Sequence, residues 1–432
     1  MKSFKSVYKY ITIIAIAFTV ALGFSAAADA SGSFTRVPFG ARSYNIFVPS
    51  SYTPGVAVPL VVMNHGCTQN SVDFATGTQM NQIAEQENFI VIYPEQPMSQ
   101  HFNRCWNWFE TAHQRRGSGE PQVIVDMVNQ VKSNFTINSD AVFAAGLSAG
   151  GALTTNLAVL YPDVFTAVSV NAGLAFQSGT SLLNATSAMN GSPATNPATA
   201  AGNAFNQVPA NARRVVPTIV FHGTADATVR PAAGEQVVTQ MISYNSRTDA
   251  SISAANRTTE NGSANGLNFA LHSFRNGAGD IIIQHYVITG LGHHWAGGNP
   301  AGSHTSASGP NASLVSWRFF QQAAGLDGNS TTPPVVEPPV VEPPVVEPPV
   351  VEPPVVEPPV VEPPVVEPPV DPTPDPTPQF TYVRANVNQH NMAGRIPATL
   401  FFHYFSLHGP TGLFNMYQVV GTNTWTSTRP GS

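Results

Sequence analysis

The sequence predicts an α/β protein, in which a mostly parallel sheet is covered by helices on both faces and is followed by a linker and a small all-β module. Apolar runs of strand length alternate with helical patterns through the larger part of the chain, as in sheets whose strands are buried on both sides. One strand–helix junction carries GLSAG at 146–150, which is typical of a sharp turn at the edge of such a sheet. A proline-rich repeat separates this region from an aromatic C-terminal segment.

The N-terminus has the pattern of a secretory signal peptide. Lysines at positions 2, 5 and 9 precede an apolar run over 11–24 and small residues that end in ADA at 28–30. A basic region, a short apolar region and an A-x-A site are the three parts of such a peptide. The apolar run is short for a bilayer span, and no other stretch is long and apolar enough. We therefore expect residues 1–30 to be removed and a mature chain, beginning near Ser31, to be secreted to the extracellular space.

The expected elements are an opening hairpin and then alternating strands and helices. Short apolar runs predict strands, and apolar residues three or four positions apart predict helices. The hairpin comprises 35–40 and 44–48; the later strands are 59–63, 89–93, 141–145, 165–170, 217–221 and 281–288; the helices are 122–135, 152–160 and 232–244. Residues 177–211 show no clear period and are interpreted as a surface excursion or as a cap over a functional site.

Composition argues against nucleic acids and membranes as partners. Only 10% of the residues are charged, and the formal net charge is −6. Acidic side chains between 337 and 375 account for more than all of this charge, and the rest of the chain carries +3. A chain so close to neutral has no basic surface for a phosphate backbone or an anionic membrane. We expect a monomer that binds neither.

Ser148 is the candidate nucleophile, because GLSAG fits the G-x-S-x-G pattern of a nucleophile elbow. In such an elbow, small residues two before and two after the serine let the backbone turn sharply from a strand into a helix. Gly146 and Gly150 supply those positions, after the strand 141–145 and before the helix 152–160. An ordinary turn is the alternative, and the flanking strand and helix favour the elbow.

Asp226 is the candidate acid of a catalytic triad, in which the acid and the base follow the serine along the chain. The strand 217–221 is followed by HGTAD, which places Asp226 at the carboxyl end of a strand, where α/β sheets keep their sites. Asp249 and Asp280 are weaker alternatives because neither follows such a strand. His222 is interpreted as a structural residue of the turn.

The candidate base lies in the glycine-rich loop after the last expected strand. This loop contains His293 and His294, and the pattern alone does not choose between them. Trp295 beside them is expected to form a wall for the substrate. A zinc site made of His293, His294 and His304 is the alternative, but the chain has no HExxH motif and no cysteine cluster. No metal or other cofactor is therefore expected.

The oxyanion hole is expected from the loop after an early strand together with the backbone N–H that follows the nucleophile. That N–H belongs to Ala149. The apolar run 60–63 leads into NHGCTQ at 64–69, so the Cys67 N–H would be the second donor to the developing negative charge.

Cys67 and Cys105, the two cysteines of the chain, are expected to form a disulfide because the protein is exported. The bridge would hold the oxyanion loop and bring Trp106 and Trp108 near the site. Core packing is the alternative for these tryptophans.

These motifs together resemble the secreted polyhydroxybutyrate (PHB) depolymerase and feruloyl esterase superfamily, which has the α/β-hydrolase fold. The resemblance covers most of 34–325 and rests on HGCTQ at 65–69, CWNW at 105–108, GLSAG at 146–150, HG at 222–223 with Asp226, and GH at 292–293 with WAGG at 295–298. It implies the catalytic residues Ser148, Asp226 and His293, because the family usually carries a small residue at the position of His294. His65, Trp106 and Trp295 are expected to contact the substrate.

The chain is expected to divide into four parts. They are the signal peptide at 1–30, an α/β-hydrolase catalytic domain at 31–326, a linker at 327–378 and a substrate-binding module at 379–432. From 333 to 367 the unit PPVVE occurs seven times, which predicts an extended polyproline II segment.

The C-terminal module contains no Asp, Glu or Lys and is rich in aromatic residues. Its alternating apolar runs and turn residues predict a small all-β unit. The stretch 390–395, HNMAGR, is similar to the H-x-x-A-G-R signature of the substrate-binding domains of PHB depolymerases, and this resemblance implies that His390 and Arg395 bind substrate. Related modules accompany chitinases.

The sequence therefore predicts an extracellular serine esterase that hydrolyses solid poly(3-hydroxybutyrate) through an acyl-enzyme, with the insoluble polyester surface as its partner. A feruloyl or acetylxylan esterase with a carbohydrate-binding C-terminal module is the first alternative. A catalytically inactive adhesin that binds polymer is the second, and the complete Ser-Asp-His set argues against it.

Overall fold

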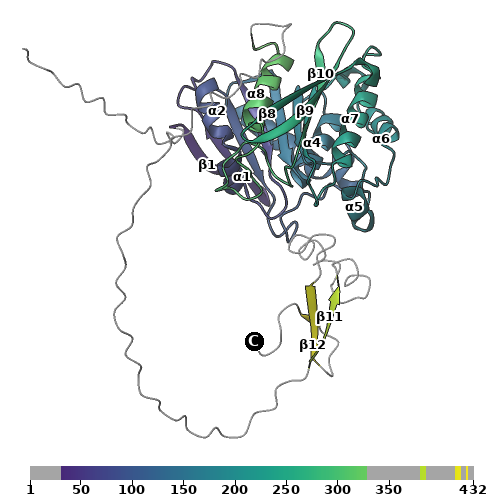
Figure 1. Cartoon of the computed structure of the whole chain (residues 1–432). Helices are drawn as coiled ribbons and strands as arrows, with labels where there is room; N and C mark the ends of the chain where they lie inside the picture. The colour runs from purple at the N-terminus through teal and green to yellow at the C-terminus, as the bar shows by residue number, and fades with distance from the viewer. Residues whose placement is uncertain (1–30, 328–379, 386–413, 420–424, 427–432) are drawn as a thin grey trace, which may run out of the picture.

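A computed structural model describes residues 31–327, 380–385, 414–419 and 425–426 of the chain (Figure 1). The predicted signal peptide at 1–30 and nearly all of the predicted linker lie outside the described residues. So do His390, Arg395 and most of the predicted C-terminal module. The division into four parts stays a prediction.

Residues 31–327 are built on one ten-stranded sheet with the order β1-β2-β4-β3-β5-β6-β7-β10-β9-β8. The central strands from β4 to β10 run parallel, and two antiparallel strands extend the sheet at each edge. This is the mostly parallel sheet that the sequence predicts. The strands are β1 (Ser33–Phe39), β2 (Arg42–Val48), β3 (Val58–Asn64), β4 (Ile90–Glu95), β5 (Ile137–Leu147), β6 (Ala167–Asn171), β7 (Thr218–Gly223), β8 (Arg257–Ala264), β9 (Leu267–Arg275) and β10 (Ile281–Ile288).

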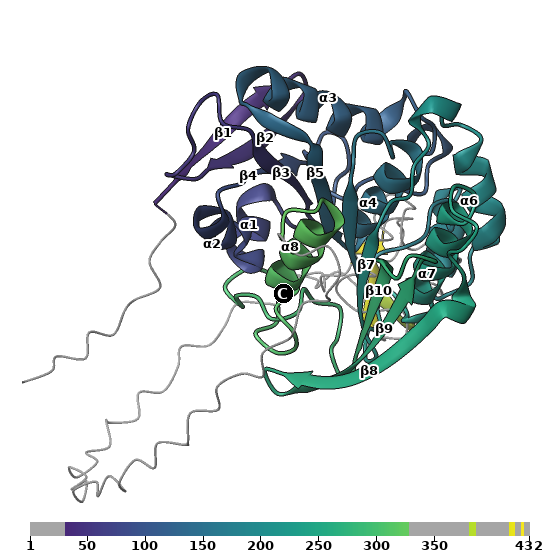
Figure 2. The ribbon, with the colours of Figure 1, turned by 90° about the horizontal axis from the view of Figure 1, so that it is seen from above.

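Helices cover both faces of this sheet, as Figure 2 shows from above. Helices α3, α4, α6 and α7 contribute to the hydrophobic cluster on one face, and α1, α2 and α8 contribute to the cluster on the other. The helices are α1 (Ser71–Thr78), α2 (Met80–Glu87), α3 (Gly119–Asn134), α4 (Ala149–Leu160), α5 (Leu182–Met189), α6 (Pro197–Phe205), α7 (Ala232–Asn245) and α8 (Ala312–Ala323).

The central strands are buried on both sides, which explains why they appear in the sequence as continuous apolar runs. In β5, Val142 and Ala144 belong to one hydrophobic cluster, while Phe143 and Ala145 belong to the other. Side chains alternate between the two faces of a strand, so a run without polar interruption is what two covered faces require.

Two parts of the fold differ from the sequence-based expectations. The edge strands β8 and β9 were not expected, because β8 is a polar strand whose side chains are mostly exposed. The insert at 177–211 contains the helices α5 and α6, and Met189 at the end of α5 lines the pocket described below.

The described residues of the C-terminal segment form a three-stranded antiparallel sheet. Its strands are β11 (Phe380–Ala385), β12 (Phe414–Val419) and β13 (Trp425–Thr426). Within the described ranges, no helix has both the length and the apolar character needed to cross a membrane.

Candidate active site

The parallel strands bring their carboxyl ends to one edge of the sheet, and the functional loops of the chain follow these ends. The loop after β3 contains Cys67, the turn after β5 contains Ser148, the loop after β7 contains Asp226, and the loop after β10 contains His293. Residues separated by up to 226 positions therefore meet at one edge, as is usual for sites in α/β sheets.

Ser148 occupies a sharp turn between β5 and α4. Its backbone has φ 58° and ψ −120°, a left-handed φ that a residue with a side chain rarely adopts. Glycine is required on both sides, because a Cβ on Gly150 would lie 2.1 Å from the Asn64 carbonyl oxygen and one on Gly146 would lie 2.3 Å from the Gly150 oxygen. The turn has the geometry of a nucleophile elbow.

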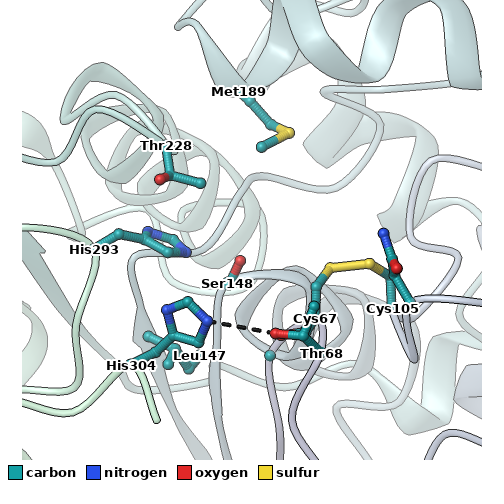
Figure 3. Close-up of a pocket in the computed structure, with 11 residues that line it drawn as sticks. Cys67, Thr68, Cys105, Leu147, Ser148, Met189, Thr228, His293 and His304 are labelled. Atoms are coloured by element: carbon teal, nitrogen blue, oxygen red, sulfur yellow. Dashed lines mark hydrogen bonds between the residues drawn. A yellow bond between two sulfur atoms is a disulfide. The ribbon is translucent and has the colours of Figure 1, made fainter. Parts of the chain in front are cut away.

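The Ser148 hydroxyl faces a histidine that is paired with a buried carboxylate. His293 Nδ1 lies 2.7 Å from Asp226 Oδ2, and Figure 3 shows the His293 ring directed toward the Ser148 side chain across the pocket. An ionised carboxylate only accepts hydrogen bonds, so Nδ1–H donates to Asp226. The other ring nitrogen, Nε2, then has a free lone pair to accept the serine proton.

Asp226 is held as an anion by the hydrogen bonds around it. Its Oδ1 accepts from the Thr228 and Val229 backbone N–H groups, each at 2.9 Å. Burial opposes ionisation, but the His293 and His222 imidazoles outweigh it and hold the pKa of Asp226 well below its usual range. His222 Nε2–H donates to the Val229 carbonyl oxygen at 2.9 Å and lies 3.5 Å from Asp226 Oδ2, so it fixes this loop from beneath.

From Gly66 to Gln69 in the loop after β3, one backbone N–H has no acceptor among the described residues. The Gly66 N–H donates to Gln69 Oε1 at 2.8 Å, the Thr68 N–H donates to the Asn103 carbonyl at 2.7 Å, and the Gln69 N–H donates to the Gly66 carbonyl at 3.4 Å. In the described part of the chain no group accepts from the Cys67 N–H between them. This amide is therefore available to an oxyanion.

Cys67 and Cys105 are joined by a disulfide with an S–S distance of 2.11 Å. This is the pairing expected from the sequence, and it links the loop after β3 to the segment that follows β4. Ala149 is the first residue of α4, so its N–H lies at the positive end of the helix dipole. The Cys67 and Ala149 amides border the same pocket as Ser148, and their role as oxyanion donors stays a prediction.

The pocket at Ser148 has two lobes, both of which include Cys67, Cys105, Ser148 and Met189. One lobe is mixed in polarity, and its further lining residues are Gly66, Thr68, Asn103, Leu147, Thr228, His293 and His304. The other lobe is apolar, and its further lining residues are Trp108, Phe109, Ala149, Leu174 and Val229.

The three residues expected in the catalytic domain to contact substrate are fully buried instead: His65, Trp106 and Trp295 have 0% of their surface exposed. The His65 ring donates to the Gly66 carbonyl and accepts from the Gln96 N–H. Trp106 Nε1–H donates to the His65 carbonyl at 3.0 Å. His65 and Trp106 thus support the loop at 64–69 from the protein interior and do not line the pocket.

Trp295 is likewise a core residue, because its ring packs edge-on against Phe74 and its Nε1–H donates to Ser313 Oγ at 3.1 Å. Trp108, for which core packing was the alternative, does line the apolar lobe. The sequence motifs located the right loops, but they could not indicate which aromatic side chain lines the pocket and which packs in the core.

The rival residues lie elsewhere. Asp249 accepts hydrogen bonds from Ser251, and Asp280 accepts one from Asn276, so each serves a local turn. His294 is exposed and is not among the pocket residues. In the described ranges, no group of His, Cys, Asp and Glu side chains is arranged to hold a metal ion.

Several pocket residues had no predicted role. Met189, Thr228 and Asn103 come from segments without a motif, and His304 was considered only as a zinc ligand. Gln69 stood in the HGCTQ motif without a function; its side chain joins the oxyanion loop to the loop of His304, because its Nε2–H donates to the Ser303 carbonyl at 2.7 Å.

Comparisons with known proteins agree with this geometry. A family model described as "Esterase PHB depolymerase" matches residues 42–264. A poly(3-hydroxyalkanoate) depolymerase C from Paucimonas lemoignei is 32% identical over 252 residues, which are 58% of this chain and 57% of the relative. A feruloyl esterase B from Thermothelomyces thermophilus is 31% identical over 191 residues, which are 42% of this chain and 64% of the relative. The chain thus spans less than two thirds of either relative.

A solved structure shows the same fold. The acetyl xylan esterase from Aspergillus awamori superposes with a TM-score of 0.52 at 23% identity, covering 61% of this chain and 94% of that one. The described sheet, the elbow and the similarity to this esterase structure together place residues 31–327 in the α/β-hydrolase fold.

Proposed function

This chain belongs to the esterase PHB depolymerase family, and from that premise we propose that it is a secreted serine esterase that hydrolyses solid poly(3-hydroxybutyrate). The observation that carries the proposal is the 2.7 Å contact between His293 Nδ1 and Asp226 Oδ2 in a pocket shared with Ser148. A nucleophile, a base and an acid in this relation form the arrangement of a serine hydrolase.

In the proposed first half-reaction, Ser148 Oγ attacks the ester carbonyl while His293 Nε2 takes its proton. Asp226 stabilises the imidazolium that forms and keeps the ring in the tautomer that exposes Nε2. The Cys67 and Ala149 N–H groups donate to the oxygen as it becomes negative, an effect worth about 3 kcal/mol for a single preorganised donor. His293 then protonates the leaving alcohol, and the C–O bond breaks to leave an acyl-Ser148.

In the second half-reaction, water replaces the alcohol. His293 takes a proton from this water, the hydroxide adds to the acyl carbonyl, and the same two N–H groups stabilise the new oxyanion. The proton returns from His293 to Ser148 Oγ as the acid leaves. The low pKa of Asp226 supports this cycle, because the carboxylate must stay ionised while His293 gains and loses its proton.

The choice of a polyester rests on the sequence beyond residue 327. A solid polymer does not diffuse, so an enzyme that acts on it gains from a second module that adsorbs to the surface and from a long spacer that lets the catalytic domain search nearby. The PPVVE repeat and the aromatic module without acidic residues supply these two properties. The relative from Paucimonas lemoignei, which is described as a polyhydroxyalkanoate depolymerase, supports the same choice.

The test is the clearing of a PHB granule suspension by the purified protein, with release of soluble 3-hydroxybutyrate measured in parallel. Wild-type protein should clear the granules, and Ser148→Ala should adsorb to them without clearing. A protein that hydrolyses soluble short-chain esters but leaves PHB granules turbid would contradict the polyester proposal while keeping the serine-esterase mechanism.

A feruloyl or acetylxylan esterase is the second candidate, favoured by the relative from Thermothelomyces thermophilus at 31% identity. The same active-site chemistry would serve either substrate. Release of ferulate or acetate from plant polysaccharide, measured beside PHB clearing on the same preparation, decides between the two candidates.

A further inference from the structure

The mixed lobe of the pocket carries polar groups that the proposed triad and oxyanion hole do not use. His304 and Asn103 both line it. The Asn103 side-chain amide makes no hydrogen bond within the described part of the chain, although its backbone carbonyl holds the Thr68 N–H. Polar groups that converge on a pocket without partners of their own are the usual means of orienting a ligand.

His304 is fixed in this lobe by the loop that carries it. Its backbone has φ 49°, a left-handed value that is unfavourable for a residue with a side chain. Its carbonyl accepts from the Trp295 N–H at 2.9 Å. The preceding Ser303 N–H donates to Asp73 in α1 at 2.9 Å, and the Ser303 carbonyl accepts from Gln69. Such a strained conformation, held by partners on both sides, is characteristic of functional positions.

The His304 ring has an N–H group that can donate a hydrogen bond to a ligand. The Thr68 hydroxyl donates to the Cys67 carbonyl at 2.6 Å, so its 3.4 Å contact with His304 Nε2 leaves the ring nitrogen as the donor. This contact is longer than an ordinary hydrogen bond. Figure 3 shows the His304 ring next to the His293 ring, with one ring nitrogen directed toward the Thr68 side chain. A ligand oxygen closer to Nε2 would accept this hydrogen bond in place of the Thr68 hydroxyl.

The position of His293 decides which half of an ester meets His304. His293 delivers a proton to the leaving alcohol, so the alcohol part must lie on the His293 side of Ser148. The His304 ring is on that side, with its centroid 6.2 Å from that of His293. The acyl part would then be left with the apolar lobe, which Trp108 and Leu174 line.

We propose that His304, assisted by Asn103, binds the alcohol part of the substrate by donating a hydrogen bond to a carbonyl oxygen that this part carries. The ligand class is an oligomeric hydroxy ester, whose alcohol part contains the carbonyl of the next unit. The inference rests on the proposed acyl-enzyme mechanism and deepens it, since it assigns the mixed lobe to the leaving group and the apolar lobe to the acyl group.

His304 is suited to this role because it is neutral at neutral pH. Burial lowers the pKa of His304, and the nearby His293 and His294 lower it further, while Asp73 opposes them. A neutral ring adds no positive charge beside the His293 imidazolium during the reaction, yet still offers one N–H donor.

The experiment compares two substrates that have the same acyl group. Methyl 3-hydroxybutyrate has methanol as its alcohol part, whereas the N-methylamide of the 3-hydroxybutyrate dimer has a carbonyl there and contains one ester. The value of kcat/KM reports the steps up to acylation, when the alcohol part is still attached. The variants are His304→Ala, His304→Asn, which tolerates a left-handed backbone, and Asn103→Ala. His294→Ala is the matched control because that side chain is exposed outside the pocket.

We expect His304→Ala to lower kcat/KM for the dimer amide by at least tenfold and to change the value for the methyl ester by less than threefold. Asn103→Ala should also lower kcat/KM selectively for the dimer amide, but by a smaller factor. His304→Asn should retain a higher kcat/KM for the dimer amide than His304→Ala. His294→Ala should not lower kcat/KM for one substrate more than for the other. Equal losses on both substrates would show that His304 supports the oxyanion loop, and no loss would show that the alcohol part lies elsewhere; either result overturns the inference.

A second pair of esters, methyl acetate and acetylated xylobiose, tests whether the alcohol part is a sugar instead of a hydroxy ester. If His304→Ala lowers kcat/KM for acetylated xylobiose but not for the dimer amide or methyl acetate, the lobe binds a carbohydrate. That result would overturn the hydroxy-ester assignment. If wild-type protein hydrolyses none of the four esters and Ser148 does not react with a fluorophosphonate, the proposed esterase function fails, which is a result distinct from the loss of selectivity.

Discussion

At the level of single residues, the candidate site depends on how burial and hydrogen bonding act on each polar group. Asp226 is buried, but three hydrogen-bond donors favour the anion, namely the His293 ring and two backbone N–H groups, and the His222 ring lies 3.5 Å away. Ser148 is presented by a strained backbone that neighbouring glycines permit. The side chains are therefore placed before a substrate arrives, which reduces the reorganisation that the reaction requires.

Removal of the nucleophile or the base should abolish most of the activity without unfolding the protein. We expect Ser148→Ala and His293→Ala each to lower kcat for a soluble short-chain ester by several orders of magnitude. Thermal unfolding of Ser148→Ala should change little, because this side chain borders the pocket and has no partner in a buried ion pair. His293→Ala should still fold but unfold at a lower temperature, because the buried Asp226 carboxylate loses a hydrogen-bond donor. His294→Ala is the control and should change kcat by less than tenfold. An indispensable His294 together with a dispensable His293 would refute the assignment of the base.

His285 should make the folded state sensitive to acid. Burial, together with the nearby His222 and His272, lowers the pKa of His285 to about 3. In the unfolded chain the same group takes up a proton near pH 6.5. Between these values the unfolded state binds more protons, so the free energy of unfolding falls as the pH falls from 6.5 toward 3. From pH 7 to pH 4 the loss through this residue should be roughly 3 kcal/mol.

Chemical denaturation of the wild type and of His285→Leu at several pH values measures this effect. The wild type should lose more stability between pH 7 and pH 4 than the variant, whatever their stabilities at pH 7. Parallel stability curves for the two proteins would show that His285 is not the source of the acid sensitivity.

At the level of elements, the elbow is the contact that fixes the nucleophile, because α4 approaches the loop after β3 at Gly150. A Cβ on Gly150 would lie 2.1 Å from the Asn64 carbonyl oxygen and 2.4 Å from the His65 carbonyl oxygen. Both atoms belong to the backbone and cannot move alone. We therefore expect Gly150→Ala to lower kcat more than tenfold and to lower the unfolding temperature.

Gly202→Ala in α6 is the matched control. The nearest atom to its added Cβ is a guanidinium nitrogen of Arg247, at the far end of a flexible side chain. Alanine favours a helix by up to about 1 kcal/mol over glycine, so this variant should be as stable as the wild type or slightly more stable. Equal effects of the two substitutions would mean that the close approach at Gly150 is unimportant.

The disulfide should matter for both activity and stability, because Cys67 carries one of the candidate oxyanion donors. Closing a loop of 38 residues stabilises a fold by roughly 3 kcal/mol or more. We expect Cys105→Ser, which keeps the Cys67 amide, to lower the unfolding temperature and to lower kcat more than it raises KM. Peptide mapping under non-reducing conditions should recover residues 67 and 105 in one linked pair; two free thiols in the purified protein would contradict this.

The parallel elements could be predicted from the sequence because their burial on two faces leaves an uninterrupted apolar run. The apolar stretches of β3, β4 and β7 and the second half of β5 follow this rule, whereas Ser169 interrupts β6, and Gln284 and His285 interrupt β10. The hairpin of β8 and β9 does not follow the rule, because β8 is polar and its register is set by pairing with β9. Its signal was the Asn265-Gly266 turn, whose two residues have φ 42° and 80°, as expected for a tight hairpin.

The helices of the insert also had local signals that a search for apolar periodicity does not detect. Helix α5 begins at a capping box formed by Ser181 and Asn184. Helix α6 has Asn196 as its N-cap and Pro197 at its first position. Caps satisfy backbone N–H groups and so define a helix start even where small residues give no clear apolar stripe.

In the candidate site, chain order led to Ser148, Asp226 and the loop of His293, and the family resemblance selected His293 over His294. The residues that reach the pocket through tertiary contacts could not be predicted. Ser148, Asp226 and His293 each follow a strand of the sheet, so topology brings them together. His304 and Asn103 reach the pocket through loops that are held by Asp73, Gln69 and the disulfide. Such placement depends on hydrogen bonds between distant segments, for which the sequence has no pattern.

At the level of the whole molecule, the chain combines a rigid sheet domain with a long proline-rich segment and a C-terminal part that contains a three-stranded sheet. The sequence 333–378, which contains the PPVVE repeat, could reach roughly 140 Å in a polyproline II conformation. If the C-terminal part binds a surface, as we propose, a spacer of this length would keep the esterase domain near that surface and raise the effective concentration of active sites there.

Removal of everything after Leu326 should therefore separate binding to a solid from catalysis. The apolar and aromatic side chains of the C-terminal module suit a polyester face, which offers few charges. Because the described pocket lies entirely within residues 66–304, we expect the truncated protein to hydrolyse a soluble short-chain ester at nearly the wild-type rate. The same protein should no longer sediment with PHB granules and should clear them more slowly. A truncated protein that still adsorbs and clears as fast as the full chain would locate the polymer-binding surface on the catalytic domain and remove the reason for assigning the substrate from the tail.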